Sequence, residues 1–127
     1  MPSVRVDIYQ EEDGECYYVE WVNTLEDDVV DKLIAAVERL EEFGHELRRP
    51  RADYLRDGIY ELRVEVGTVN YRVLYFFFGR VAAIISHGIT KKDKIPANEI
   101  DRAVDRKRRY EQDPQRHTYV WEPEDDH

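Results

Sequence analysis

The chain has 127 residues, which is typical of a single domain, and its hydrophobic residues make up 42%, enough to form a buried core. No apolar run approaches the roughly 18 residues that span a bilayer. The N-terminus has no basic region followed by an apolar one, and the one cysteine, Cys16, excludes a disulfide framework and a cysteine-based zinc cluster. We therefore expect a reduced, cytoplasmic protein without a membrane partner.

The net charge of −9 is divided unevenly along the chain. Residues 1–47 carry 3 basic and 14 acidic groups, residues 48–109 carry 15 and 8, and residues 110–127 carry 1 and 6. An acidic protein does not attract a polyanion over long distances, but exposed charges are largely screened beyond about 8–10 Å. The basic middle of the chain can therefore bind phosphate, although the same residues are also compatible with solvated helix and loop faces.

The N-terminal third predicts a strand followed by helices. Residues Val4–Tyr9 alternate in polarity, which places Val4, Val6 and Ile8 on one face of a strand. Residues 16–22 fit a strand by composition, but their spacing favours a short helix. Apolar residues at helical spacing predict a longer helix over residues 25–43, with Thr24 as its N-cap and Gly44 just after its end.

The rest of the chain predicts three strands and a helix. A loop is expected over His45–Gly58, and then strands joined by tight turns, which indicate an antiparallel meander. The strands are expected at Ile59–Val66, Tyr71–Phe78 and Val81–His87, a loop at residues 88–95, and a helix at Pro96–Gln112. This order predicts an α+β fold: a small antiparallel sheet, made of the N-terminal strand and the meander, with helices on one side.

We expect residues 1–112 to form the domain and residues 113–127 to form an acidic tail or edge arm, in which Tyr119, Val120 and Trp121 can dock. The chain lacks the glycine-rich phosphate loops and the serine nucleophile elbow of common enzyme families. Its histidines, His45, His87, His117 and His127, lack metal-pair spacing. We therefore expect no metal and no cofactor.

A cluster of basic residues is associated with the predicted sheet. Arg63 and Arg72 interrupt the apolar patterns of adjacent strands, and His87, Lys91 and Lys92 lie at or after the end of the third strand. An arginine within a sheet is costly to bury unless it is paired or faces a ligand.

Simpler interpretations of the same residues remain open. Arg63 or Arg72 can pair with Glu61 or Glu65, His87 can be a hydrogen-bonded part of the scaffold, and the two lysines can belong to a solvated loop.

As a group, these side chains suit cleavage of RNA without a metal ion. That reaction needs a base for the 2′-OH proton, a cationic clamp for the phosphorane and an acid for the leaving oxygen. Guanidinium groups bind phosphate bidentately, which suits Arg63 and Arg72 as the clamp. His87 is the natural titrating group, and a lysine of lowered pKa, Lys91 or Lys92, is the alternative.

Several segments of the chain resemble the RelE/HigB-like toxin family, and within it the branch of phage-derived Gp49-like proteins. The matching segments are L-R-D-G-I-Y-E-L-R-V at 55–64, N-Y-R-V-L-Y-F-F at 70–77, and S-H-G-I-T-K-K at 86–92, which precedes a proline and an E-I-D-x-A helix. The resemblance covers about residues 17–110 and also includes the E-E-F-G end of the preceding helix.

The resemblance implies a RelE-like fold, a cognate antitoxin that is usually a small helix-turn-helix protein, and metal-independent cleavage of mRNA on the ribosome by 2′-OH attack. It implies a phosphate clamp of Arg63 and Arg72, proton transfer by His87 or Lys91, and a second phosphate contact at Lys92. We expect further phosphate contacts from the arginines of the preceding loop, which are Arg48, Arg49, Arg51 and Arg56.

The acidic balance of the chain departs from this basic family and favours an alternative. In that alternative the protein is a catalytically inactive module of the same fold that pairs with an antitoxin-like regulatory protein. Retention of Arg63, Arg72, His87 and Lys91 favours the nuclease. If these four residues form a catalytic site, they converge on one concave, solvent-open patch.

Overall fold

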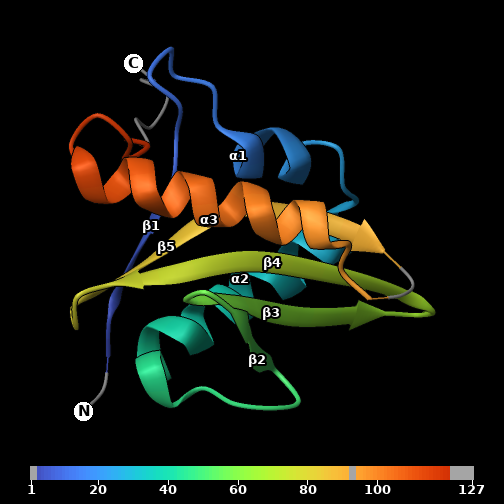
Figure 1. Cartoon of the computed structure of the whole chain (residues 1–127). Coiled ribbons are helices and arrows are strands. Elements are labelled where there is room, and N and C mark those ends of the chain that lie inside the picture. Colours follow the sequence, from blue (N-terminus) through green and yellow to red (C-terminus); the bar gives the residue numbers. More distant parts are fainter. Residues whose placement is uncertain (1–2, 92–93, 121–127) are drawn as a thin grey trace, which may run out of the picture.

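A mixed five-stranded sheet with helices on both faces forms the protein (Figure 1). The computed structural model describes residues 3–91 and 94–120. Its elements are β1 (Arg5–Ile8), α1 (Tyr17–Val22), α2 (Asp27–Phe43), a 3₁₀ turn η1 (Gly44–Glu46), β2 (Ala52–Arg56), β3 (Ile59–Val66), β4 (Val69–Phe78), β5 (Ala82–Lys91) and α3 (Ala97–Gln112). The α+β class, the meander and the short helix after Cys16 are confirmed.

The strand order is β1-β5-β4-β3-β2, and β4 is the central strand. β1 pairs with β5 in parallel, whereas the other pairs are antiparallel, so the prediction of a purely antiparallel sheet was wrong. The physical reason is that β1 is separated from β5 by α1, α2 and the strands β2, β3 and β4. A long connection of this kind permits a parallel pairing, which a tight turn cannot provide.

β2 lies inside the segment that was predicted to be a loop. It forms a hairpin with β3 through Asp57 and Gly58, which both have positive φ, at 53° and 83°. Asp-Gly in a two-residue connection is a strong hairpin signal, because this turn requires positive φ at both central residues. The arginines and Pro50 that precede β2 obscured that signal.

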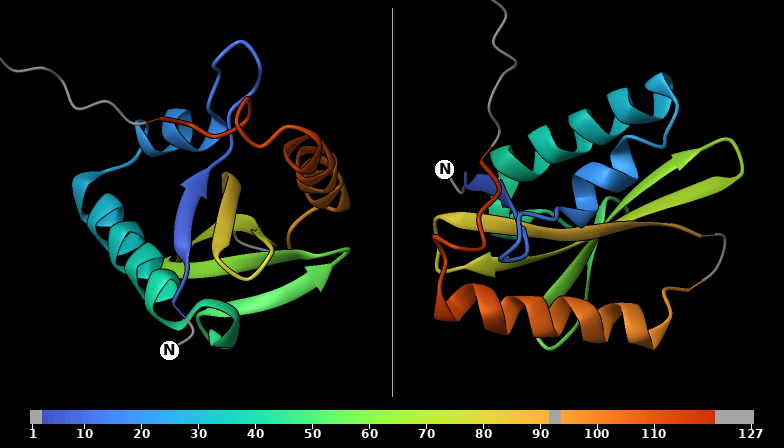
Figure 2. Two further views of the ribbon diagram at one scale, coloured as in Figure 1. Left: turned by 90° about the vertical axis from the view of Figure 1, so that its left-hand side faces the viewer. Right: turned by 90° about the horizontal axis from the view of Figure 1, so that it is seen from above.

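Each face of the sheet has its own core, which corrects the prediction of helices on one side only. On one face α2 packs Val29, Leu33 and Leu40 against Leu62 and Val73. The residues of α3 pack against the other face, where the core has a different set of members. The buried residues of that second core are Tyr9, Ile59, Leu74, Phe76, Ala82, Ile84, Ile89, Ala103 and Tyr110. The sheet therefore lies between α2 and α3 (Figure 2).

The boundaries of two elements differ from those predicted. α2 begins at Asp27, with Glu26 at the N-cap position, and Thr24 instead donates its hydroxyl to the Trp21 carbonyl at the end of α1, 2.7 Å away. Gly44 ends α2 with a φ of 54°, as its position predicted. β5 extends to Lys91, so the first half of the loop predicted at residues 88–95 is strand.

The segment that follows α3 lies along the free edge of β1. The Tyr119 amide donates to the Ile8 carbonyl at 2.7 Å, and Tyr9 forms an antiparallel bridge with Thr118. Trp121, whose docking was predicted, lies outside the described residues. In the part of the chain that the structure describes, no helix has both the length and the apolarity needed to span a bilayer.

Gly88 allows α1 to approach β5 closely. A Cβ atom at Gly88 would lie only 2.1 Å from Cε3 of Trp21, whose indole Nε1 donates to Thr90 Oγ1 at 3.1 Å. Trp21 therefore covers the backbone of β5 at the point where any side chain would displace it.

We predict that Gly88→Ala lowers the free energy of unfolding by about 1–3 kcal/mol, because the added methyl group forces the indole ring away from the strand. Urea denaturation measures the loss. In a Trp21→Ala background the same substitution removes less stability, since the ring is already gone. An equal loss in both backgrounds would show that the contact with Trp21 is not the cause.

Candidate phosphate-binding site

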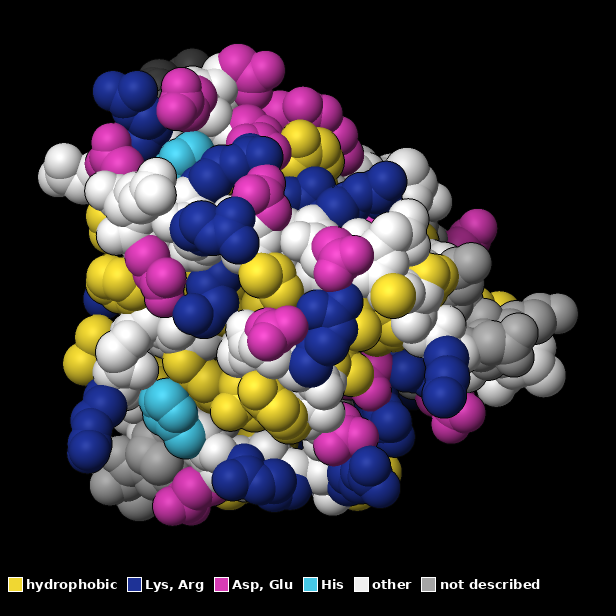
Figure 3. Space-filling view, in the orientation of Figure 1, with side chains coloured by type: hydrophobic (Ala, Val, Ile, Leu, Met, Phe, Trp, Pro, Cys, Tyr) yellow, Lys and Arg dark blue, Asp and Glu magenta, His cyan; other side chains and the backbone are white. Residues whose placement is uncertain are grey.

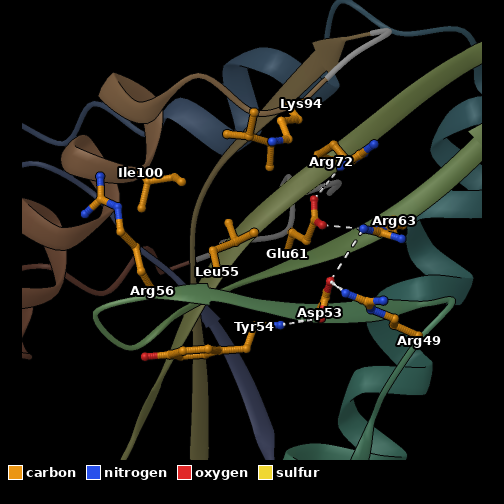
Figure 4. A pocket seen from close by; sticks show the side chains of 11 residues that line it. Arg49, Asp53, Tyr54, Leu55, Arg56, Glu61, Arg63, Arg72, Lys94 and Ile100 are labelled. Atoms are coloured by element: carbon orange, nitrogen blue, oxygen red, sulfur yellow. Dashed lines mark hydrogen bonds and ion pairs between the residues drawn. The ribbon is translucent and has the colours of Figure 1, made fainter.

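A hollow with a volume of about 620 Å³ lies between β2, β3, β4 and the start of α3 (Figure 4). It contains two of the four predicted catalytic residues, Arg63 and Arg72. The lining residues are Arg49, Asp53, Tyr54, Leu55, Arg56, Glu61, Arg63, Arg72, Lys94, Ile95 and Ile100.

Positive and negative side chains alternate through the hollow. Arg72 Nη1 donates to Glu61 Oε1 at 2.6 Å, and Arg63 Nε donates to Glu61 Oε2 at 3.0 Å. On its far side, the guanidinium of Arg63 lies 3.6 Å from Asp53, which also pairs with Arg49 at 2.9 Å. Figure 4 shows these contacts as one continuous line from β4 across β3 to β2.

The strand register explains why the two predicted arginines meet. Arg63 and Arg72 are direct partners across β3 and β4, while their neighbour Leu62 faces the α2 core. Like charges that lie directly opposite one another destabilise a sheet. Glu61, 2% exposed, offsets this repulsion because it accepts a hydrogen bond from each guanidinium.

The hollow keeps an excess of positive charge despite these pairs. Its lining includes five basic and two acidic side chains. The Nε atom of Arg72 is buried and has no hydrogen-bond partner among the described residues. The cationic excess is suited to bind an anion.

Lys94, which is not among the predicted site residues, is exposed and lines the hollow beside the two arginines. The signal was present in the K-K-D-K run before Pro96, but only the first two lysines were assigned. The predicted ion pair with Glu61 is confirmed, and Glu61 pairs with both arginines where the prediction was for either one.

The four loop arginines have different surroundings. Arg49 and Arg56 line the hollow, although Arg56 is also paired with Asp57 and with Asp101 of α3. Arg51 lines a neighbouring hollow of about 410 Å³, which also contains Arg63 and Arg72. Arg48 donates to backbone carbonyls at the end of η1, so its contacts are those of a structural residue.

Basic side chains are spread over the α3 face of the molecule, with acidic ones between them (Figure 3). His87 is on this face too, but it does not line the hollow and is only 7% exposed. The structure therefore brings Arg63 and Arg72 together in the hollow and places His87 outside it. Lys91 ends β5 opposite Asn70, and its side chain and all of Lys92 lie outside the described structure.

Both ring nitrogens of His87 are engaged under α3. Nε2 lies 2.9 Å from Glu99 Oε1, and Nδ1 lies 3.0 Å from Arg106 Nη1. Because a guanidinium only donates, Nδ1 accepts and the ring proton is on Nε2, where it is donated to Glu99. Burial and the adjacent charge of Arg106 lower the pKa of His87 to about 4, against the opposing effect of Glu99.

Arg106 completes this contact between α3 and the sheet. It is 9% exposed, lies 4.1 Å from the centre of the Tyr17 ring, and also donates to Ser86 Oγ at 3.2 Å. Among the described residues it has no carboxylate partner within ion-pair distance, and burial lowers its pKa. The neutral His87 therefore provides an acceptor for a buried cation, which is a structural role.

We predict that stability falls as the pH is lowered from about 6.5 to about 4. The folded-state pKa of His87 is depressed to about 4, so the unfolded chain takes up this proton first. Within that window the free energy of unfolding falls by up to about 1.4 kcal/mol for each pH unit. The stability that depends on neutral His87 is fully present only above the pKa of histidine in the unfolded chain.

Denaturation at a series of pH values for His87→Gln measures this contribution, because glutamine removes the titrating group. His45→Gln is the matched control, since His45 stacks on Phe77 and contacts neither Glu99 nor Arg106. The assignment fails if His87→Gln keeps the full wild-type dependence on pH.

The described residues include no group of three or more histidine, cysteine, aspartate or glutamate side chains arranged to hold a metal ion. A family model described as "Phage derived protein Gp49-like" matches residues 20–108, which is more than half of the chain. A search of curated proteins gives no significant match.

Proposed function

Because the chain belongs to the phage-derived Gp49-like family, a branch of the RelE/HigB-like toxins, we propose that it is an antitoxin-controlled toxin that cleaves mRNA on the ribosome. Family membership indicates the toxin–antitoxin role, and the cleavage reaction is our proposal. The observation that carries it is the cationic hollow in which Arg63 and Arg72 lie side by side. The partner we expect is an antitoxin, by family resemblance a small helix-turn-helix protein, and the site of action is the cytoplasm.

In this proposal Arg63 and Arg72 hold the scissile phosphate. Each guanidinium presents a fork of donors that is complementary to phosphate oxygens. In the free protein, Glu61 holds the two side chains next to one another, so the clamp is positioned before RNA binds. Lys94, and Lys92 as the resemblance implies, supply further positive charge.

Proton transfer in the proposed reaction falls to a group close to this clamp. A phosphate that binds Arg63 and Arg72 competes with Glu61 for the same donors, which leaves the carboxylate free to accept the 2′-OH proton. Lys91 remains the candidate acid by resemblance. The engaged nitrogens of His87 favour a positioning role for it, through α3, over direct proton transfer.

One observation favours the catalytically inactive binding module as the second candidate. Both arginines are already paired with carboxylates, Arg72 with Glu61 and Arg63 with Glu61 and Asp53. If RNA cannot displace these carboxylates, the hollow is a stable part of the fold, and the protein acts by pairing with its regulatory partner.

We predict that the protein cuts mRNA at codon-phased positions in a reconstituted translation reaction and that Arg72→Ala lowers the cleavage rate by at least about 100-fold. The expected loss reflects the removal of one preorganised donor group from the transition state. Mapping of message ends by primer extension measures both the rate and the phase of the cuts.

Arg80→Ala is the matched control, because Arg80 is exposed in the turn between β4 and β5 and does not line the hollow. Arg72→Lys keeps the positive charge but loses the forked pair of N–H donors, so this variant is expected to retain only part of the wild-type cleavage activity. Intact message at high protein excess, with the fold confirmed by circular dichroism, would favour the binding module.

We also predict a strong dependence of RNA binding on salt. If two or three phosphates are held, the logarithm of the affinity for a non-cleavable single-stranded RNA falls with the logarithm of salt concentration with a slope of roughly −1.4 to −2. Fluorescence anisotropy at salt concentrations from about 50 to about 300 mM measures the slope, because counterion release dominates the salt dependence in this range. A flat response would indicate that the hollow does not grip phosphates.

A further inference from the structure

The hollow has two chemically different ends. Arg49, Arg63, Arg72 and Lys94 form a cationic end (Figure 4). At the opposite end, Leu55, Ile95 and Ile100 form an apolar wall of half-buried side chains, and Arg56, which is paired with Asp57 and Asp101, lies beside it. In Figure 4 Leu55 and Ile100 lie on one side of Glu61, and Arg63 and Arg49 lie on the other.

We propose that this hollow is a nucleotide subsite, in which the cationic end holds a phosphate of the RNA and the apolar wall receives the adjoining base. The inference rests on the proposed function and adds the part of the substrate that the wall recognises. The volume of about 620 Å³ lies within the roughly 300–1,000 Å³ of small-molecule sites. If the ligand of the hollow were inorganic phosphate alone, the side chains of the apolar wall would remain in contact with water.

The apolar wall is held in place by the contact between β2 and α3. Leu55 precedes the hairpin turn, and Ile100 lies near the start of α3. The two elements are joined by Arg56, which donates to Asp101 Oδ1 at 2.6 Å and to the Ala97 carbonyl at 3.3 Å. The wall is therefore formed before a ligand binds, which lowers the ordering cost of binding.

The character of the wall predicts which nucleotides bind best. Aliphatic side chains contact the face of a base and cannot read its hydrogen-bonding edge, so discrimination depends on the apolar area that is buried. A purine has the larger face. The subsite is therefore expected to prefer purine over pyrimidine nucleotides, and both over inorganic phosphate.

Titrations followed by NMR test the subsite with adenosine 3′-monophosphate, cytidine 3′-monophosphate and inorganic phosphate. We expect the adenosine nucleotide to bind about tenfold more tightly than phosphate, with the cytidine nucleotide between them. Ile100→Ala and Leu55→Ala are expected to reduce this ratio to less than about threefold. Lys94→Gln is expected to weaken the binding of all three ligands by a similar factor.

Two matched controls are available outside the hollow. Val104→Ala shortens another apolar side chain of α3, and Lys32→Gln removes an exposed ammonium from α2 on the opposite face of the sheet. Both are expected to leave the three affinities unchanged. Equal affinities for the nucleotides and phosphate, or a ratio that survives both wall substitutions in folded protein, would overturn the proposal.

A phosphate beside a base belongs either to an RNA chain or to a free nucleotide. A 2′-O-methyl hexaadenylate distinguishes the two, because it is expected to bind more tightly than the mononucleotide if the subsite serves RNA; weaker binding would overturn that assignment. None of these titrations requires cleavage. If the protein binds nucleotides but does not cut mRNA, the subsite is supported and the proposed nuclease activity is rejected. If it cuts mRNA but does not bind nucleotides in this way, only the subsite is rejected.

Discussion

The hydrogen bonds from Arg63 and Arg72 to the buried carboxylate of Glu61 are the interaction on which the candidate site depends. Two guanidinium groups on adjacent strands repel each other, and a buried charge is costly unless it is paired. Glu61 removes both difficulties because it lies between them. The same arrangement leaves the outer faces of the arginines in an open hollow, where a phosphate can compete for their donors.

The acidic helix α2 and the cationic hollow lie on opposite faces of the sheet. α2 carries six acidic and two basic residues and covers one face, while the hollow opens on the face that carries α3. Screening at physiological salt limits exposed charges to about 8–10 Å. The overall charge of −9 therefore does not determine the local potential of the hollow, and it is compatible with an anionic ligand there.

The position of α3 controls the shape of the site. His87 binds Glu99 and Arg106, and Arg56 binds Asp101, so contacts from β5 and from the end of β2 fix the helix at several points. Ile100 and the segment before α3 complete the wall of the hollow. A residue that resemblance suggests as catalytic thus has an evident role in holding the helix that bounds the site.

The sequence by itself determined the features that depend on local periodicity and register. Alternating residues predicted β3 and β4 as neighbours, which was enough to bring Arg63 and Arg72 together. Only the tertiary structure decided the parallel pairing of β1, the helices on both faces, the place of Lys94 and the engagement of His87. These depend on contacts between residues far apart in the chain, and on burial that selects the ionic state of a side chain, neither of which a local pattern contains.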